Sequence, residues 1–150
     1  MANETQQITG VGYEGHSLTS FLASLTDAKV ECVVDVRLNA ISRKKGFSKR
    51  VLASSLAEAG IEYLHLPTLG NPKTNREGFW KPGTTLAAHA HAEYRRVLQS
   101  DEALAAMREL LDKAATGAVV LLCFEAREET CHRHLLIDEL RHFQLADSSR

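Results

Sequence analysis

The sequence predicts a single α/β domain with a mainly parallel sheet of about four or five strands flanked by helices. Two observations lead to this prediction. Short apolar segments rich in β-branched residues alternate with longer segments whose apolar residues recur at helical spacing. The connections between successive strands contain these helices, and helical crossovers join parallel strands. The expected architecture is therefore Rossmann-like, with three layers.

The first strand and helix are expected near the N-terminus. Residues 8–13 form the strand, and Ser17 can cap the helix that follows. The apolar residues of that helix follow the i, i+3, i+4, i+7 pattern at Leu18, Phe21, Leu22 and Leu25. Residues 30–36 (VECVVDV) are then expected as a strand buried on both faces.

A second helix is expected between Ser48, a suitable N-cap, and Gly60, which suits the position after a helix C-terminus. A third strand follows at residues 61–66, where apolar and polar residues alternate. Residues 67–83 contain all three prolines and the only tryptophan, and we expect them to form a long loop.

The second half of the chain contains the remaining elements. Two helices, a strand and a last helix are expected at residues 85–98, 101–115, 118–124 and 130–143. The strand segment AVVLLCF is the most continuous apolar run and is expected at the centre of the sheet. The domain is expected to span residues 8–145, between a disordered or extended segment 1–7 and a flexible segment 146–150.

Composition limits the classes of partner. A net charge of −1 excludes a global field that attracts nucleic acid or membranes, so anion binding must come from local clusters. No apolar run approaches the roughly 20 residues that span a bilayer, and the N-terminus lacks a secretory signal pattern. Cys32, Cys123 and Cys131 lack the spacing of a disulfide framework, which favours unpaired thiols in a cytoplasmic protein. No oligomeric state is indicated.

Gly10, Gly12 and Gly15 have the G-x-G-x-x-G spacing of dinucleotide-binding proteins, and Asp35 lies where a ribose-binding acid is expected. That fingerprint needs a hydrophobic strand before its first glycine, and Ile8 is the only large apolar residue there. We therefore expect no NAD site. The glycines are instead expected to allow close backbone packing, although Gly15 can still present N–H groups to an anion.

Ligands of parallel α/β sheets bind beyond the carboxyl ends of the strands. The residues expected at that edge include most of the chemically reactive side chains of the chain: Glu14, Gly15, His16, Asp35, Arg37, His65, Asn71, Cys123, Glu125, Cys131, His132 and Arg133. The sequence therefore predicts a site at this edge.

Cys131, His132 and Arg133 begin the last predicted helix. If Thr130 caps it, Cys131 occupies the first helical position, where the helix dipole favours a nucleophilic thiolate. The alternative is a cysteine packed under the helix, with His132 and Arg133 on the surface.

Two carboxylates are candidates for proton transfer. Glu125 shares a side of the fourth strand with Cys123 and could be a general acid or base, or it could pair with Arg127 or Arg37. Asp35 and Arg37 could be a catalytic carboxylate and a substrate clamp, or a buried ion pair.

Residues 37–50 contain six basic residues and no acidic one. Lys44 and Lys45 lead into a predicted helix, so a phosphate could contact cations and backbone donors together, unless the segment is simply a solvated loop. The long loop adds Asn71 and the aromatic pair Phe79 and Trp80, which suit a lid or a base-stacking surface, or a cover for the sheet edge.

Metal-ligating residue types are present, but their spacing predicts no metal site and we expect no cofactor. Cys123, Cys131 and His132 would suit zinc, yet the sequence contains no C-x-x-C or H-x-x-x-H pair that would indicate one.

Four ordered motifs between Ile8 and Leu140 carry a family resemblance: GYEGHSLTSFLASL, VVDVRLNAISRKKGFSK, IEYLHLPTLGNPK and LLCFEAREETCHRHLL. Together they resemble the domain-of-unknown-function family 488. The resemblance implies a compact α/β domain and no settled activity.

The leading hypothesis is an enzyme, a hydrolase or transferase, that acts on a phosphorylated, nucleotide or nucleic-acid substrate. Arg37, Lys44, Lys45 and Arg133 would bind the anion together with Gly15, His16 and Asn71. Glu125 or Asp35 would transfer the proton, Cys131 would be the nucleophile, and His132 is a further catalytic candidate. A nucleic-acid-binding module without chemistry, using residues 37–50 and Phe79/Trp80, is the alternative. A protein-interaction domain is the third possibility.

Overall fold

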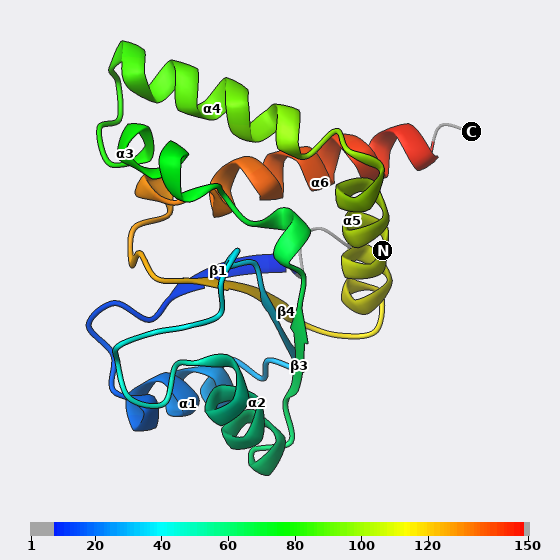
Figure 1. Ribbon diagram of the computed structural model, residues 1–150. Coiled ribbons are helices and arrows are strands. Elements are labelled where there is room, and N and C mark those ends of the chain that lie inside the picture. Colours follow the sequence, from blue (N-terminus) through cyan, green and yellow to red (C-terminus); the bar gives the residue numbers. More distant parts are fainter. Residues whose placement is uncertain (1–7, 149–150) are drawn as a thin grey trace.

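The sheet has four parallel strands in the order β1-β4-β2-β3 (Figure 1). The computed structural model describes residues 8–148. Its strands are β1 (Ile8–Gly12), β2 (Cys32–Asp35), β3 (Glu62–His65) and β4 (Val119–Cys123). The predicted single-domain α/β fold with a parallel sheet is confirmed, and the apolar run expected at the centre is β4, an inner strand.

Helices cover both faces of the sheet (Figure 1). One face is covered by α1 (Leu18–Asp27) and α2 (Lys49–Glu58), and the other by α4 (Thr85–Val97), α5 (Asp101–Ala114) and α6 (Arg133–Ser148). Successive residues of β2 supply the two layers of the core. Val33 packs in the cluster beneath α1 and α2, and Val34 packs in the cluster beneath the other helices. This alternation explains why β2 is apolar on both faces.

Local signals place the first helices as expected. Ser17 is the N-cap of α1, where its side chain accepts from the backbone N of Ser20 and the Ser20 hydroxyl accepts from the backbone N of Ser17. Gly60 follows α2 with φ +76°, a conformation that glycine adopts without a steric penalty. Ser48 precedes α2 but makes no side-chain cap, because its hydroxyl donates to the carbonyl of Ser42.

Two element predictions need correction. Residues 67–83 are not one loop. They contain 3₁₀ turns at Pro67–Leu69 and Lys73–Asn75 and the short helix α3 (Arg76–Phe79). Asn75 Nδ2 donates to the carbonyl of Ala90 and ties this segment to α4. The last helix begins at Arg133 rather than at residue 130.

The predicted terminal segments fall mostly outside the described residues. Residues 1–7 and 149–150 lie outside them, and α6 extends through residues 146–148. Within residues 8–148, none of the helices combines the length and the apolar character needed to cross a membrane.

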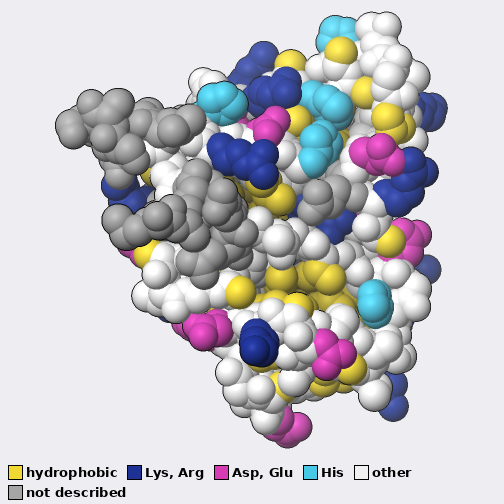
Figure 2. Space-filling model, turned by 180° about the vertical axis from the view of Figure 1, so that it is seen from behind, with side chains coloured by type: hydrophobic (Ala, Val, Ile, Leu, Met, Phe, Trp, Pro, Cys, Tyr) yellow, Lys and Arg dark blue, Asp and Glu magenta, His cyan; other side chains and the backbone are white. Residues whose placement is uncertain are grey.

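Aromatic side chains join α3 to the helical layer. The Phe79 ring contacts the rings of His91 in α4 and His134 in α6, with centroids 4.9 and 6.3 Å away. On the face shown in Figure 2, His side chains gather mainly in the upper half of the molecule, the half that α3, α4 and α6 occupy in Figure 1. These contacts hold α3 beside the carboxyl edge of the sheet.

The strand register brings the carboxyl ends of the strands together. Gly12 of β1 pairs with Cys123 of β4, while Asp35 of β2 pairs with Leu122 of β4 and His65 of β3. The segments that follow these strands therefore meet at one edge, which is where the candidate site lies.

Candidate functional site

A pocket lies at the carboxyl edge of the sheet. About 90 Å³ of it is accessible to the centres of water molecules. Its lining comes from segments far apart in the sequence: Tyr13, Arg37, Leu38, Asn39, Ile41, Asn71, Arg76, Phe79, Trp80, Cys123, Phe124, Glu125, Thr130, Cys131 and His132. The structure therefore brings a carboxylate, two cysteine sulfurs, an imidazole and a guanidinium together at this edge.

Gly12 brings the end of β1 against the loop that follows β4. A Cβ atom added at Gly12 would overlap the backbone carbonyl of Glu125 and lie 2.8 Å from the backbone N of Ala126. The Glu14 carboxylate then accepts from that same backbone N of Ala126, at 3.0 Å. The glycine at this position serves close backbone packing, which is the role that the sequence analysis preferred.

Asp35 and Arg37 form a buried ion pair at the end of β2. The Asp35 carboxylate is 0% exposed, and it accepts from Nε and Nη2 of Arg37 at 2.8 and 2.7 Å. It also accepts from the backbone N of Arg37 and from the Tyr63 hydroxyl at 2.5 Å. Of the two interpretations that the sequence left open, the geometry corresponds to the ion pair.

The surroundings of this pair shift the pKa values of Arg37 and Tyr63. Burial lowers the pKa of Arg37, but the hydrogen bonds and the negative charge of Asp35 outweigh it and raise that pKa above its ordinary value. Burial, and then the hydrogen bond to Asp35, raise the pKa of Tyr63. Arg37 lines the pocket and Asp35 does not, so the carboxylate positions the guanidinium from behind.

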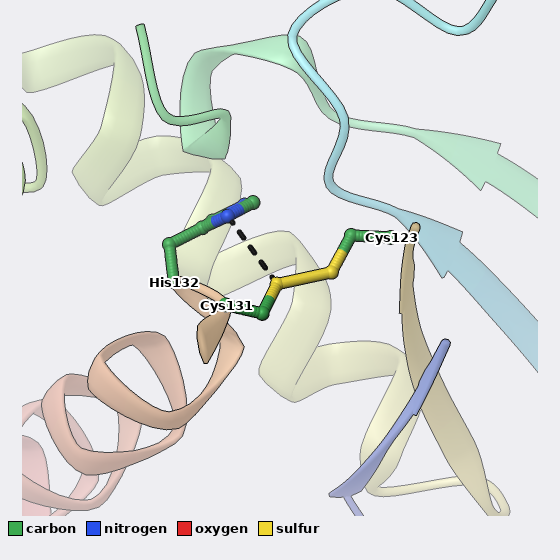
Figure 3. Close-up of side chains that lie close together, drawn as sticks. All are labelled: Cys123, Cys131 and His132. Atoms are coloured by element: carbon green, nitrogen blue, oxygen red, sulfur yellow. Dashed lines mark hydrogen bonds between the residues drawn. A yellow bond between two sulfur atoms is a disulfide. The ribbon is translucent and has the colours of Figure 1, made fainter. Parts of the chain in front are cut away.

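Cys123, Cys131 and His132 form the second buried group. Figure 3 shows Cys123 at the end of β4 and the other two residues just before α6, with the imidazole directed at the Cys131 sulfur. The two cysteines are joined in a disulfide, and Nδ1 of His132 lies 3.6 Å from Cys131 Sγ. The expectation of unpaired thiols therefore holds only for Cys32, which is buried.

The helical position predicted for Cys131 is wrong. Residues 128–130 form a separate 3₁₀ turn, in which the Thr130 hydroxyl donates to the carbonyl of Arg127 and caps nothing. The α6 helix begins at Arg133, and its first backbone acceptor is the carbonyl of His132, which bonds the backbone N of Leu136. Cys131 therefore lies outside the helix, and the helix dipole cannot be assigned to it.

His132 is buried and neutral. Its Nε2 lies 3.0 Å from the carbonyl oxygen of Val36. Burial lowers the pKa of His132 to about 4, with the positive charge of Arg133 acting in the same direction and the hydrogen bond to Val36 opposing it. The alternative that placed His132 and Arg133 on the surface is wrong, since both are buried.

Arg133 contacts the backbone of Glu125 and not its carboxylate. Nη2 of Arg133 donates to the Glu125 carbonyl at 2.5 Å, which ties the loop after β4 to the start of α6. The Glu125 carboxylate accepts from Nε1 of Trp80 at 3.4 Å. It does not pair with Arg127, which bonds Glu129, or with Arg37, so its expected ion pairs are absent. Glu125 also lies beyond β4, which ends at Cys123.

Several predicted anion-binding residues lie outside the pocket lining. Nζ of Lys44 donates to the carbonyl of Tyr13 at 3.2 Å and lies over the Phe47 ring. Nδ1 of His16 bonds the Ser20 hydroxyl, while Gly15 and Lys45 are exposed. Of the predicted anion-binding set, Arg37 and Asn71 line the pocket.

Arg76 is a pocket residue that the sequence patterns did not indicate. It is half-buried, and within residues 8–148 no hydrogen-bond or ion-pair partner is found for its guanidinium. Its position in the sequence, between Asn71 and Trp80, was the available signal.

The aromatic pair divides between core and surface. Phe79 is 2% exposed, because it packs against Tyr94 and the two histidine rings, so of the two alternatives left open by the sequence the stacking role does not fit Phe79. Trp80 is 55% exposed at the pocket. Three further exposed apolar side chains, Leu38, Ile41 and Phe124, also line the pocket.

Comparisons with known proteins identify a family. No match was found among curated proteins or among solved structures. A family model, described as "Domain of unknown function DUF488", matches residues 17–140, which include α1 to the first half of α6 and nearly the whole pocket lining. The chain belongs to this DUF488 family.

Proposed function

We propose that this protein is an enzyme, a hydrolase or transferase, that acts on a phosphorylated nucleotide-type substrate bound in the pocket at the carboxyl edge of the sheet. One observation carries the proposal. The Arg76 guanidinium, which has no partner among residues 8–148, an exposed indole and a group of reactive side chains line a single pocket.

Arg76 is the phosphate-binding residue in this proposal. Arg37 is engaged by Asp35, and its Nη1 donates to the carbonyl of Phe47 at 2.7 Å, so little of its hydrogen-bonding capacity remains. The Arg76 guanidinium is half-buried and can form charge-assisted hydrogen bonds to phosphate oxygens. Arg37, whose guanidinium is held in place by Asp35 and Phe47, forms a rigid part of the pocket wall.

Trp80 supports a planar ring in the substrate. Its indole is exposed beside the pocket, and base–aromatic stacking contributes about 1–3 kcal/mol per base. Ile41, which is 79% exposed, and Phe124 add apolar surface next to it. A nucleobase on this apolar rim and a phosphate at Arg76 would use both features of the pocket.

The reacting group is Glu125, since Cys131 is joined to Cys123 in a disulfide and offers no thiolate in this state. The Glu125 carboxylate is half-exposed, and its one hydrogen bond within the described part of the chain is the long bond from Trp80, so it can exchange protons with a bound substrate. Asp35 is fully buried, accepts several hydrogen bonds and is not part of the pocket lining, so we assign proton transfer to Glu125.

Calorimetric titration with nucleoside monophosphates tests substrate binding. Hydrogen bonds to charged groups contribute about 1.5–3 kcal/mol, so Arg76→Ala should weaken binding by roughly 10- to 150-fold. Arg43→Ala is the matched control, since Arg43 is exposed and outside the pocket lining, and it should change the affinity less than two-fold. Equal losses in the two variants would refute the assignment.

Catalysis is tested separately, with the same compounds followed by chromatography. Glu125→Gln keeps the shape and the hydrogen-bond acceptor for Trp80, so it should bind normally and lose turnover. Full turnover by this variant would exclude Glu125 as the proton-transfer group.

A nucleic-acid-binding module without chemistry is the second candidate, favoured by the exposed apolar rim and the exposed cations Arg43, Lys45 and Lys49. It predicts that single-stranded oligonucleotides bind with an affinity that falls steeply with salt. It also predicts that binding survives Cys131→Ala and that no bound compound is converted. Filter binding at two ionic strengths with this variant distinguishes the candidates.

A further inference from the structure

We propose that Cys123, Cys131 and His132 bind a zinc ion when the two cysteines are reduced. Their ligand atoms all lie within 4.8 Å of one another, and all three residues line the pocket. Two thiolates and an imidazole are ligands that zinc prefers.

The hydrogen bond of His132 presents the correct nitrogen. The carbonyl of Val36 can only accept, so Nε2 is the donor and Nδ1 of the neutral ring carries the free lone pair. A ligating histidine commonly donates its second N–H to a backbone carbonyl in this way, which fixes its tautomer and orientation. Figure 3 shows the Nδ1 side of the ring directed at the Cys131 sulfur.

The distances fit a tetrahedral ion. Bond lengths of about 2.3 Å to sulfur and about 2.0–2.1 Å to nitrogen place those two ligand atoms about 3.6 Å apart. Cys131 Sγ and His132 Nδ1 are 3.6 Å apart already. The distance between these two ligand atoms therefore does not need to change when zinc binds.

The backbone spacing of the cysteines also suits a bridging ion. Their Cα atoms are 7.6 Å apart, whereas the Cα atoms of disulfides usually lie roughly 4.4–6.8 Å apart. Two sulfurs on one tetrahedral zinc ion lie about 3.8 Å apart, and this longer connection accommodates the wider backbone separation.

Three protein ligands leave one coordination position open. Within residues 8–148 the cluster contains no fourth histidine, cysteine or carboxylate, and three protein ligands plus a water or substrate are typical of catalytic zinc sites. The open position would adjoin the pocket that Glu125 also lines. If the proposed function holds, the cysteines are ligands rather than nucleophiles, and Glu125 is the proton acceptor for a zinc-bound water.

Formation of the site from the disulfide requires a reductant. A phosphine attacks one sulfur and cleaves the S–S bond. Water then supplies the oxygen of the phosphine oxide and the two protons of the thiols. Zinc binding subsequently releases two protons to solvent as the thiols become thiolates.

Metal analysis of the full chain tests the proposal. Protein reduced with a water-soluble phosphine, incubated with zinc sulfate and desalted should retain about one zinc ion per chain. Cys123→Ala, Cys131→Ala and His132→Asn should each weaken the affinity, measured by chelator competition, at least ten-fold. The controls Cys32→Ala and His89→Asn change a cysteine and a histidine outside the cluster and should retain the metal.

A second readout does not depend on any variant. Cobalt(II) bound to the reduced wild-type chain should give the thiolate-to-metal charge-transfer absorption and the intense visible bands of a tetrahedral site. Substoichiometric zinc after reduction, or a cobalt spectrum without thiolate bands, would overturn the proposal. Zinc binding without nucleotide binding would instead refute the proposed function, and nucleotide binding without zinc would refute only the metal site.

Discussion

Replacing Asp35 with alanine tests whether the buried ion pair between Asp35 and Arg37 stabilises the carboxyl edge of the sheet, where Arg37 lines the pocket. The variant would leave a guanidinium that is only 6% exposed without its charge partner. Removing one partner of a buried ion pair costs about 3–5 kcal/mol. For a chain of this length the midpoint of thermal unfolding should fall by about 6–20 °C, at roughly 2–4 °C per kcal/mol.

Circular dichroism during thermal and urea unfolding measures this loss. Glu93→Ala is the control, because Glu93 pairs with Arg96 on the exposed surface of α4 and such pairs contribute about 0–1 kcal/mol. The double variant Asp35→Ala/Arg37→Met removes the unpaired charge and should recover part of the stability. If Asp35→Ala is no less stable than Glu93→Ala, the ion pair does not stabilise this edge and the reasoning is refuted.

Three further predictions follow from the same packing. Gly12→Ala should lower the free energy of unfolding by about 1–3 kcal/mol in urea titrations, because the added Cβ would overlap the Glu125 backbone; an unchanged stability would contradict that close approach. Phe79→Ala should lower the free energy of unfolding by about 3–5 kcal/mol and Trp80→Ala by less than about 0.5 kcal/mol, because Phe79 is buried and Trp80 is exposed. Comparable losses of stability in the two variants would contradict this difference in burial. Burial and the charge of Glu62 raise the pKa of Cys32 from 9.0 to about 11, so its thiolate is scarce below that pH. Alkylation of Cys32, followed by mass spectrometry, should accelerate until about pH 11, and a plateau near pH 9 would show an ordinary thiol.

Sequence patterns predicted the fold because its signals are local. The period of the apolar residues identified the strands and most of the helices, and Ser17 and Gly60 marked helix ends through their own backbone chemistry. The rule that parallel strands present their carboxyl ends at one edge then placed Arg37, Glu125 and Cys131 around one pocket.

The detailed site could not be predicted because it depends on contacts between distant segments. Thr130 has the residue type of a helix cap, but its hydroxyl donates a hydrogen bond to the carbonyl of Arg127 instead. The partner of Lys44, the burial of Arg133 and the accessible guanidinium of Arg76 follow from how loops pack, and residue type alone does not report that packing. The approach of Cys131 to Cys123 likewise depends on the path of the loop after β4.

Trp80 offers the most direct test of substrate binding, since it is the only tryptophan of the chain and lies at the pocket. Its fluorescence should change saturably as a nucleoside monophosphate is added to the wild-type protein. Arg76→Ala should need at least ten-fold more ligand for the same change, and the phosphate-free nucleoside should bind comparably weakly to the wild type. An unchanged emission up to millimolar ligand, or identical titrations with and without the phosphate, would contradict a phosphorylated nucleotide in this pocket.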